Sequence, residues 1–581
     1  MAIIGIDLGT TNSLVSVWKD GKSILVPNSF GEYLTPSVVG LDDDGSLIIG
    51  RIAKERLISH PDVTISSFKC FMGTDMMIDL GEDSYTPSEV SSFVLRKLKE
   101  DAEIFLGEKV EEAVISVPAY FDDNGRNATK LAGELAGLKV ERIINEPSAA
   151  ALAYKVDTDN EDTYLVFDFG GGTLDISVVD IFDSIIEIIA VAGDNHLGGD
   201  DFNLTIAKHF CVENHLDFNE LPLEVKAIII KQAEQCKIAL STQESAGMII
   251  NLNDESYSLV LDNQKLLQIT APLFERLEKP IIKAMRSAQV MPDDISEVIL
   301  VGGSSHMLLV KKFLENLFRR SIRISISPDT AVAIGVGIAA GIKERKEDVK
   351  DMILTDICPF TLGTNVFNSD DPNRPIFKPM IDHNTTLPAS YESTFYTIAD
   401  NQTSLCFRIA QGEKLYFDQN LYLGEIEVSV PPAAEGEQSA NLRFTYDING
   451  ILQVDVFVPS TGEKKSKLIL NKNTRLTEEQ LASKIAELEK IKIQPRDMEE
   501  NKLLVARAES LFEENAGPIR DIIRERLHAF DLGINSRNNR RIRQARRSFD
   551  AFLTAIENNA VNPFNIFNDE YYDDEDWEDE E

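Results

Sequence analysis

A carboxylate, a glycine and three hydrogen-bonding side chains near the start of the chain follow an order that suits phosphate binding. In the segment IDLGTTNS, Asp7 ends an apolar run and Gly9 lets the backbone turn closely. Thr10, Thr11 and Asn12 then offer hydroxyl and N–H groups to an anion. A carboxylate beside such a loop can also serve Mg²⁺, which takes oxygen ligands and usually keeps several waters.

A second segment, FDFGGGTLDIS, repeats this arrangement. Its members are the carboxylates Asp168 and Asp175, the glycines Gly170, Gly171 and Gly172, and the hydroxyl of Thr173. One such loop is weak evidence because Gly-rich turns are common, whereas two copies with flanking acids are much stronger. Neither copy matches the P-loop pattern GxxxxGK[ST], which the chain lacks. The repetition indicates two related halves that face a central ligand cleft.

The elements that must position these loops follow an α/β pattern over residues 1 to about 345. Helical patterns such as SEVSSFVLRKLKEDAEIFLG alternate with short strand-like runs. These runs are AIIGIDLG, EAVISVPA, TYLVFDFG, IIEIIAVA and EVILVGG. The apolar stretch from Ala331 to Ile342 is shorter than the ~20 residues that span a bilayer and is interrupted by glycines. We therefore predict a buried helix there.

The pattern changes after this α/β part. Residues 349–356 predict an interdomain linker with the apolar string Met352, Ile353 and Leu354. Exposed linkers are usually polar, and docking of this string in one state would explain its composition. Strand runs and turn signals over 357–475 predict a β-sandwich, in which Asn449 and Gly450 form a two-residue hairpin turn.

Helical patterns follow over 476–560, and they fit either a lid or a simple terminal bundle. The first pattern begins with a capping box from Thr477 to Gln480, which Leu476 and Leu481 flank as a hydrophobic staple. Residues 561–581 contain the acidic run NDEYYDDEDWEDEE, which predicts a disordered tail. Its simplest role is to keep the protein soluble, and the alternative is a docking role for Trp577 and its acidic neighbours.

Composition narrows the classes of function. The 581 residues are 43% hydrophobic and 27% charged, as in soluble globular proteins. The formal charge of -38 argues against nucleic-acid binding, because phosphate neutralisation needs a basic surface. Five scattered cysteines without a CxxC pattern fit a reducing cytoplasm. The first residues have no signal-peptide pattern. We therefore expect a cytoplasmic protein without a membrane partner.

Long strings in residues 1–345 resemble the DnaK-type 70-kDa heat-shock chaperones, which share the actin/hexokinase ATPase fold. These strings are IGIDLGTTNS, VISVPAYFDD, IINEPSAAALAY, FDFGGGTLDIS, HLGGDDF, VILVGGSS and PDTAVAIG. DICPFTLG, HNTTLP and ADNQTS extend the resemblance through the β unit, and the linker DMILTDICPFTLG most resembles the HscC branch. The resemblance implies an actin/hexokinase-like ATPase domain over 1–348, a β-sandwich peptide-binding domain and an α-helical C-terminal lid. It also implies an ATP-dependent chaperone in which ATP hydrolysis controls the affinity for unfolded or extended apolar peptides.

The resemblance assigns residues to ATP or ADP, Mg²⁺ and K⁺. Lys69, Glu146, Asp168 and Thr173 correspond to catalytic positions, and Asp7, Asp168 and Asp175 correspond to the acids around the cations. The nucleotide-binding set is Thr10, Thr11, Asn12, Gly170, Gly171, Gly172, Gly198, Gly199, Glu234, Lys237, Ser241, Gly302, Gly303, Ser304 and Asp329. Ile238 stands where some members have arginine, which can stack on adenine, so the nucleotide affinity is expected to be lower here.

The resemblance also assigns residues outside the nucleotide site. Peptide-lining positions are Phe395, Leu405 and Phe407, with Phe367 and Ile398 near an arch over the peptide. On residues alone, Leu405 and Phe407 share one sheet face and read equally as sandwich core. Positions that couple ATP to the second domain are Pro118, Arg126, Asp351, Ile353, Leu354 and Asp356. Implied partners are a J-domain co-chaperone, near Arg142 and Asn145, and a nucleotide exchange factor.

Two other classes of function remain open on the residues alone. A sugar or metabolite kinase on the same ATPase fold would use the phosphate loops but has no need of the β unit or linker. A non-enzymatic adaptor with a relic nucleotide site would not need Lys69, Glu146 or Thr173. Peptide-stimulated hydrolysis without phosphoryl transfer to a small molecule separates the chaperone from both.

Overall fold

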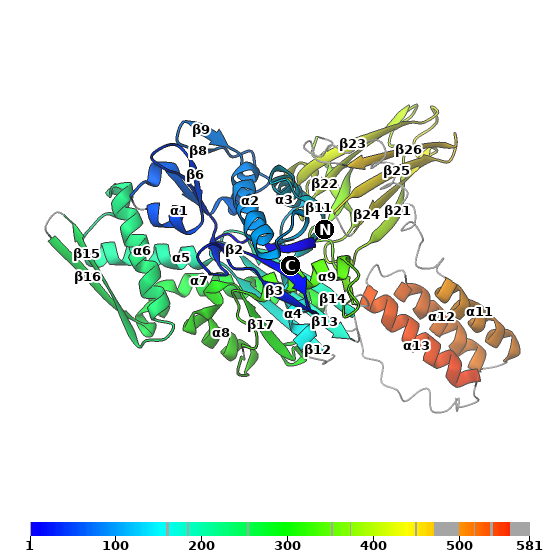
Figure 1. The fold of residues 1–581 in the computed structure, drawn as a ribbon. Helices are drawn as coiled ribbons and strands as arrows, with labels where there is room; N and C mark the ends of the chain where they lie inside the picture. The colour runs from blue at the N-terminus through cyan, green and yellow to red at the C-terminus, as the bar shows by residue number, and fades with distance from the viewer. Residues whose placement is uncertain are drawn as a thin grey trace.

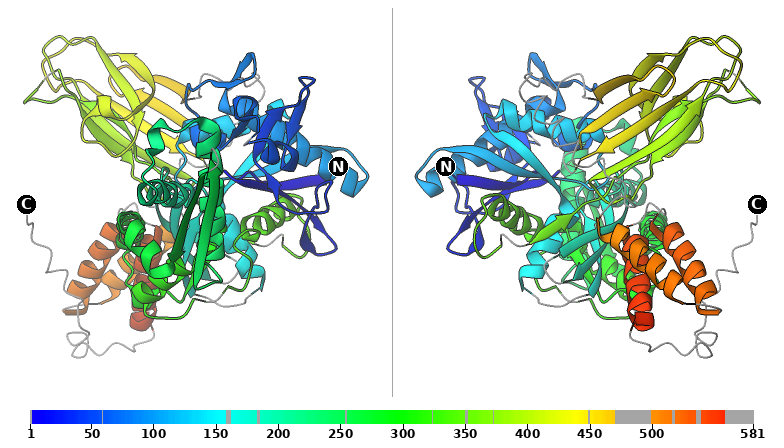
Figure 2. Two further views of the ribbon diagram at one scale, coloured as in Figure 1. Left: turned by 90° about the vertical axis from the view of Figure 1, so that its left-hand side faces the viewer. Right: turned by 90° about the vertical axis from the view of Figure 1, so that its right-hand side faces the viewer.

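A computed structural model describes residues 2–57, 59–157, 162–182, 185–252, 255–322, 324–349, 352–371, 373–447, 450–469, 499–515, 518–534 and 539–557. It contains an α/β part with both phosphate loops, a two-sheet β part and a bundle of helices (Figure 1). In both views of Figure 2 the β part and the bundle lie toward the same side of the α/β part, the β part near the top and the bundle near the bottom. Asp351, the predicted capping box and the acidic tail lie outside the described residues.

Two central sheets of the α/β part are built in the same way. Their strand orders are β11-β10-β1-β2-β3 and β17-β12-β13-β14-β18. The strands are β1 (Ala2–Asp7), β2 (Asn12–Lys19), β3 (Lys22–Leu25), β10 (Val110–Val117), β11 (Lys139–Asn145), β12 (Asp162–Phe169), β13 (Leu174–Phe182), β14 (Ile185–Asp194), β17 (Glu297–Val301) and β18 (Ile353–Thr355). Both β1 and β12 pair in parallel with one neighbour and antiparallel with the strand after their own loop. This repetition agrees with two related halves.

Helices cover these sheets. They are α2 (Pro87–Leu106), α3 (Asp123–Leu135), α4 (Glu146–Asp157), α5 (Gly199–Glu213), α6 (Leu223–Ala239), α7 (Asn263–Ala288), α8 (Leu308–Phe318) and α9 (Ala331–Lys343). The predicted strands and α2 are confirmed. A reciprocal capping box between Thr86 and Glu89 starts α2, and Gly107 ends it in the left-handed conformation with φ 71°.

The apolar stretch after Thr330 forms the predicted buried helix, α9. Its glycines let it approach its neighbours closely, because a Cβ on Gly335 would lie 1.7 Å from the Ala149 carbonyl oxygen of α4. The helix packs against α4, β1 and β2 and joins the two halves through one apolar core. Among the described residues, no helix has the length and apolar character needed to span a membrane.

Short strands and one short helix lie at the edges of the α/β part. They are β4 (Thr35–Pro36), β5 (Val38–Leu41), β6 (Leu47–Ile49), α1 (Arg51–Arg56), β7 (Thr64–Ser66), β8 (Ile78–Leu80), β9 (Asp83–Tyr85), β15 (Ser245–Leu252) and β16 (Glu255–Asp262). The last two form an antiparallel hairpin that projects away from the β part (Figure 1).

The β part consists of two four-stranded antiparallel sheets, in the orders β20-β19-β22-β23 and β21-β24-β25-β26. The strands are β19 (Leu362–Val366), β20 (Ile376–Ile381), β21 (Ala389–Tyr396), β22 (Ser404–Gln411), β23 (Leu421–Ser429), β24 (Ser439–Tyr446), β25 (Leu452–Val458) and β26 (Glu463–Ile469). Both sheets bury alternate residues in one shared core, which includes Ile409 and Phe444. The predicted β24–β25 hairpin is present, with Gly450 at φ 77°, and Asn449 lies outside the described residues.

The C-terminal helices are α11 (Glu499–Glu514), α12 (Pro518–Ile534) and α13 (Asn539–Glu557). They share one apolar core in which Phe530 and Phe549 stack with ring centroids 4.6 Å apart. The helical sequence patterns EENKLLVARAESLFEENAG and IRQARRSFDAFLTAIENN predict α11 and α13, and neither of them covers α12. Helix α12 begins at Pro518, directly after Gly517, and contains Gly533 near its end, and these two glycines weaken a local helix signal.

Candidate active site

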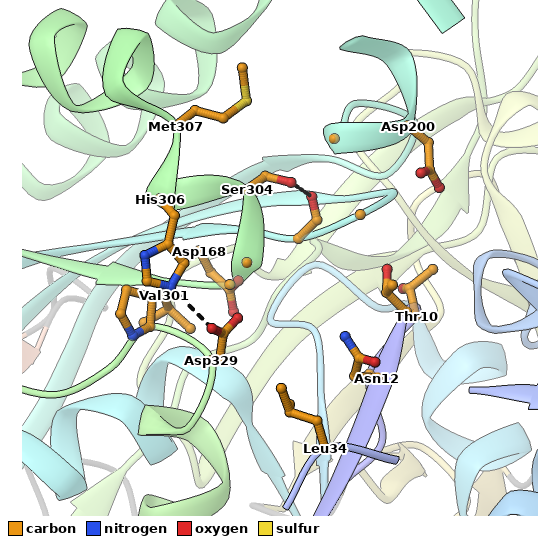
Figure 3. Close-up of a pocket in the computed structure, with 18 of the residues that line it drawn as sticks. Thr10, Asn12, Leu34, Asp168, Asp200, Val301, Ser304, His306, Met307 and Asp329 are labelled. Atoms are coloured by element: carbon orange, nitrogen blue, oxygen red, sulfur yellow. Dashed lines mark hydrogen bonds and ion pairs between the residues drawn. The ribbon is translucent and has the colours of Figure 1, made fainter. Parts of the chain in front are cut away.

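A cavity of about 600 Å³ lies where the two phosphate loops face each other. The first loop (residues 7–12) connects β1 to β2, and the second loop (168–175) connects β12 to β13. Figure 3 shows Thr10 and Asn12 on one side of this space and the linked pair His306 and Asp329 on the other. Its size and its mixture of apolar and polar walls suit a small-molecule ligand.

Most of the predicted nucleotide and catalytic residues line this one cavity. They are Asp7, Thr10, Thr11, Asn12, Lys69, Glu146, Asp168, Gly170, Gly171, Thr173, Gly199, Glu234, Lys237, Ser241, Gly302, Gly303, Ser304 and Asp329. Gly172, Gly198 and Asp175 lie directly behind the wall. Gly172 packs on Cys70 and Thr10, Gly198 lies against the backbone of Gly171, and Asp175 is buried where its Oδ1 accepts from Tyr120 N.

Hydrogen bonds to neighbouring elements hold the second loop in place. The carbonyl of Gly170 accepts from Gly199 N at 3.0 Å and from Ser304 Oγ at 2.8 Å. Lys237 Nζ of α6 donates to the Gly199 carbonyl at 2.9 Å. Hydrogen bonds therefore join the loop, the start of α5, the last turn of α6 and the turn after β17 into one wall.

Gly302 shows why this wall needs a residue without a side chain. Its φ is +80°, and a Cβ there would lie 2.5 Å from the Phe169 carbonyl oxygen and 2.9 Å from Asp168 Oδ1. A larger residue would meet both backbone strain and direct overlap. The turn after β17 can therefore lie flat against the second loop only with glycine at this position.

Lys69 is a buried cation at the base of the cavity. Its Nζ donates to Glu146 Oε1 at 2.7 Å, and the two side chains are only 5% and 10% exposed. Lys69 lies in a 3₁₀ turn (Phe68–Phe71) that follows Ser67, whose φ is +58°. Burial lowers the pKa of Lys69, but Glu146, Asp7 and Asp168 outweigh this effect and raise it. The ammonium is therefore held charged beside both phosphate loops.

Three aspartates lie around Lys69, and the positive charge near them is too small to balance their negative charge. Burial and then the Glu146 carboxylate raise the pKa of Asp7 to about 7 and that of Asp175 to about 7. Burial, followed by Glu146 and Asp175, raises the pKa of Asp168 well above its usual range. One ammonium cannot balance four buried carboxyl groups, so the donor set fits bound cations.

The kind of cation follows from how these carboxylates are arranged. In the described part of the chain, no three His, Cys, Asp or Glu side chains converge as a metal cage. The oxygen donors of Asp7 and Asp168 fit a hydrated Mg²⁺ that also binds ligand phosphates, since Mg²⁺ keeps several waters and uses one or two carboxylates.

The sequence patterns missed five polar residues that line the cavity, which are Lys54, Asp200, Asn203, Thr242 and His306. His306 Nε2 lies 3.1 Å from Asp329 Oδ2, and this contact raises the pKa of His306. Asp200 and Asn203, on the first turns of α5, face the cavity beside the second loop. His306 lies two residues after Ser304, which was predicted to bind the nucleotide. This closeness in the sequence was the signal that could have placed His306 at the cavity. Ile238 also lines the cavity, with 59% of its surface exposed.

Several predicted coupling residues lie where the linker meets the α/β part. The guanidinium of Arg126 donates to Asn145 Oδ1 at 2.5 Å, and Asn145 Nδ2 donates to Asp356 Oδ1 at 2.5 Å. Strand β18 extends the second sheet, where Ile353 pairs with Ile185 and Leu354 with Ile186 in a parallel ladder. Pro118 lies at the end of β10, in the turn that leads to the ring contact of Tyr120 with Phe360.

The predicted peptide residues divide into two groups. Leu405 and Phe407 are buried in the sandwich core, where the Phe407 ring lies 5.3 Å from the partly buried Phe395 ring. Phe367 and Ile398 are 52% and 51% exposed. The structure thus places two of the five at the surface and three in or against the core, and their role in peptide binding stays a prediction.

Comparison with known proteins identifies the family. The family model described as Hsp70 protein matches residues 3–79 and 74–548. Proteins named chaperone protein DnaK from Thermotoga neapolitana, Thermotoga petrophila and Thermotoga maritima are each 38% identical over 529 residues. The match covers 88% of this chain and 87% of each relative. The chain therefore belongs to the Hsp70 family of ATP-hydrolysing chaperones that bind unfolded polypeptides.

Proposed function

We propose that ATP in the 600 Å³ cavity favours the docked arrangement seen here, in which linker and β-sandwich rest on the ATPase part. Docking opens the peptide site, and hydrolysis releases the dock and traps the peptide. The observation that carries this proposal is the pairing of β18 with β14, because it makes the linker a strand of the same sheet that holds the second phosphate loop. Peptide affinity can then differ between nucleotide states.

Hydrolysis in this proposal uses the chain's own polar groups at the base of the cavity. Backbone N–H groups of both loops and the hydroxyls of Thr10, Thr11 and Thr173 hold the phosphates. The Lys69 ammonium stabilises negative charge on the transferring phosphoryl group and orients the attacking water. Glu146 holds the Lys69 ammonium in place. Asp7, Asp168 and Asp175 hold the cations, which we assign as Mg²⁺ and K⁺. Bound Mg²⁺ would neutralise phosphate charge.

The residues around the remaining cavity fit the nucleoside. Two groups of residues line this end of the cavity. One group comes from α6 and the turn after it, and the other comes from the turn after β17 and from Asp329. The residues are Glu234, Lys237, Ser241, Gly302–Ser304 and Asp329. We assign adenosine to this end. Ile238 offers an apolar face there in place of a planar cation, which supports a lower nucleotide affinity than in members with arginine.

The finer organisation is part of the same proposal. We assign the ATPase domain, with an actin/hexokinase-like fold, to 1–348, the linker to 349–356, the peptide-binding domain to 357–475, the lid to 476–560 and an acidic tail to 561–581. The exposed Phe367 and Ile398 would contact an extended apolar peptide, whose backbone would bond to the sandwich. We place the chain in the HscC branch on its linker, in the cytoplasm, with a J-domain partner near Arg142 and Asn145 and a nucleotide exchange factor.

Single-turnover ATP hydrolysis tests this function. The intact chain and Lys69→Ala are compared with and without an extended apolar peptide. Peptide should accelerate a slow basal rate, and Lys69→Ala should abolish turnover while ATP still binds. ATP binding with no effect of peptide would favour an adaptor, and phosphoryl transfer to a sugar would favour a kinase.

A further inference from the structure

A buried hydrogen bond joins the ATPase part to the β-sandwich at a point that none of the assignments above includes. Tyr446 Oη, at the end of β24, donates to Asp123 Oδ1, in the first residue of α3, at 2.6 Å. Tyr446 is 1% exposed and Asp123 is 7% exposed. The two residues are 323 positions apart in the sequence and belong to different parts of the molecule. The hydrogen bond can therefore form only while the two parts are docked.

The surroundings of this bond offer Asp123 little compensation for the loss of water. Its backbone N–H donates to Gln411 Oε1 at 3.2 Å, and Gly450 of the β24–β25 turn packs beside both partners. The other titratable or charged groups that act on Asp123 and Tyr446 are Asp122, Arg126 and the buried thiol of Cys358. Arg126 directs its guanidinium to the Ala119 and Phe121 carbonyls and to Asn145. Within the described residues Asp123 forms no ion pair, and its carboxyl is stabilised from the β-sandwich by the phenol of Tyr446 and, to a smaller extent, by the side chain of Gln411.

We propose that the Tyr446–Asp123 hydrogen bond is a clasp between the two parts whose strength depends on whether Asp123 carries a proton. The inference rests on the proposed function in one respect, since docking is taken to be the state that ATP favours. Separation of the two parts would return both side chains to water. A phenylalanine at 446 would pack equally well but would leave the Asp123 carboxylate buried without this donor.

The sign of the proton dependence follows from burial. In the docked structure, burial raises the pKa of Asp123 above its usual range, and this outweighs the lowering effects of Tyr446, Arg126 and Gln411. In the undocked state the carboxyl regains water, so its pKa returns toward the ordinary value. The docked state therefore binds more protons, and docking should strengthen as the pH falls.

The test uses the full chain with ATP and reads docking directly from amide hydrogen exchange in β18, after correction for the intrinsic pH dependence of exchange. Wild type, Tyr446→Phe, Asp123→Asn and the double variant are compared between about pH 5.5 and about pH 8. Tyr422→Phe is the matched control, because its hydroxyl bonds Glu425 at 3.3 Å on the exposed face of the same sandwich. ATP-triggered release of a fluorescent peptide is recorded in parallel.

Tyr446→Phe should reduce the docking equilibrium about 10-fold at the upper pH and less at the lower pH. Asp123→Asn should stay docked and lose the pH dependence, and Tyr446→Phe should cost much less in that background. Equal β18 protection in Tyr446→Phe and wild type, or wild-type pH dependence in Asp123→Asn, would overturn the clasp. If β18 protection changes in the clasp variants as expected while ATP leaves peptide release unchanged, the clasp is supported and the proposed ATP cycle is wrong.

Discussion

Lys69 Nζ lies 2.7 Å from Glu146 Oε1, and this pair joins the first half of the ATPase part to the start of α4 beneath both phosphate loops. The lysine comes from a short 3₁₀ turn, and the glutamate is the first residue of a helix that packs against α9. The same carboxylate therefore fixes the Lys69 ammonium and belongs to the element that leads, through Asn145, to the linker. This gives the nucleotide site a short physical path to the β-sandwich.

Glu146→Gln should slow single-turnover hydrolysis by about 10²-fold, because the ammonium loses the charge that positions it. ATP affinity should change far less, since the phosphate loops remain intact. Rapid-quench measurement of bound ATP gives the rate, and calorimetry gives the affinity. Glu111→Gln, an exposed carboxylate on β10, serves as the control and should behave as wild type. An unchanged hydrolysis rate in Glu146→Gln would remove Glu146 from the catalytic set.

Gly302→Ala should lose ATP binding and cost roughly 2–3 kcal/mol of unfolding free energy, because strain at positive φ adds to overlap with Phe169 and Asp168. Gly45→Ala is the matched control, since Gly45 has φ +81° but no atom within 4 Å of the built Cβ. It should cost only about 1 kcal/mol, from backbone strain alone. Denaturant unfolding and ATP titration of both variants measure the difference. Equal losses in the two variants would mean that crowding at Gly302 has no importance.

His306→Ala should weaken ATP binding about 10-fold near pH 6.5, if its planar ring stacks on the base at the proposed adenosine end. The hydrogen bond to Asp329 raises the pKa of His306 above its ordinary value. The protonated pair is therefore fully present below about pH 6.5 and is lost as the pH rises through the folded pKa. Wild-type ATP affinity should fall over that range.

The pH profile of His306→Ala separates this residue from other causes. In the variant, ATP affinity should vary less between about pH 6 and about pH 8.5 than in wild type. Fold stability should change little, because the His306 and Asp329 side chains are 43% and 33% exposed and water screens them. The same steep profile in wild type and variant would assign the titration to another group.

Phe407→Ala should reduce the stability of the fold, whereas Phe367→Ala should weaken peptide binding. Phe407 is 3% exposed, so its truncation should cost about 3–5 kcal/mol of stability. Phe367 is 52% exposed, so its truncation should leave stability nearly unchanged and weaken binding of an apolar peptide. Thermal unfolding and fluorescence anisotropy with a labelled peptide measure the two effects. Unchanged peptide affinity in Phe367→Ala would place the peptide elsewhere.

Local patterns were sufficient for most elements of the fold. Strand β1 and helix α2 have clear periodicity and end signals, and Thr86 and Gly107 mark the bounds of α2 within its own sequence. Helix α12 was missed because its evidence is tertiary, in the stacking of Phe530 on Phe549 of another helix. Its local sequence has a glycine directly before the first turn, Gly517, and another in the last turn, Gly533, which reduces the helix signal.

The site was predictable where chemistry repeats along the chain. The two Gly-rich loops have flanking acids, and the structure brings both to one cavity. His306 could be placed there only after the turn at Gly302 was folded. The Tyr446–Asp123 contact has no local signature at all, because it depends on how two separately folded parts meet. Long-range contacts of this kind need the assembled molecule.

In the proposed cycle, ATP lowers the affinity for peptide by docking β18 onto β14. The most direct measurement is the dissociation constant of one extended apolar peptide with ATP and with ADP, for wild type and Leu354→Ser. Wild type should bind at least about 10-fold more weakly with ATP, the range of coupling free energies typical of linked sites. Leu354→Ser should bind equally in both states, because its linker strand loses its apolar contact. Equal affinities in wild type with ATP and ADP would contradict the account.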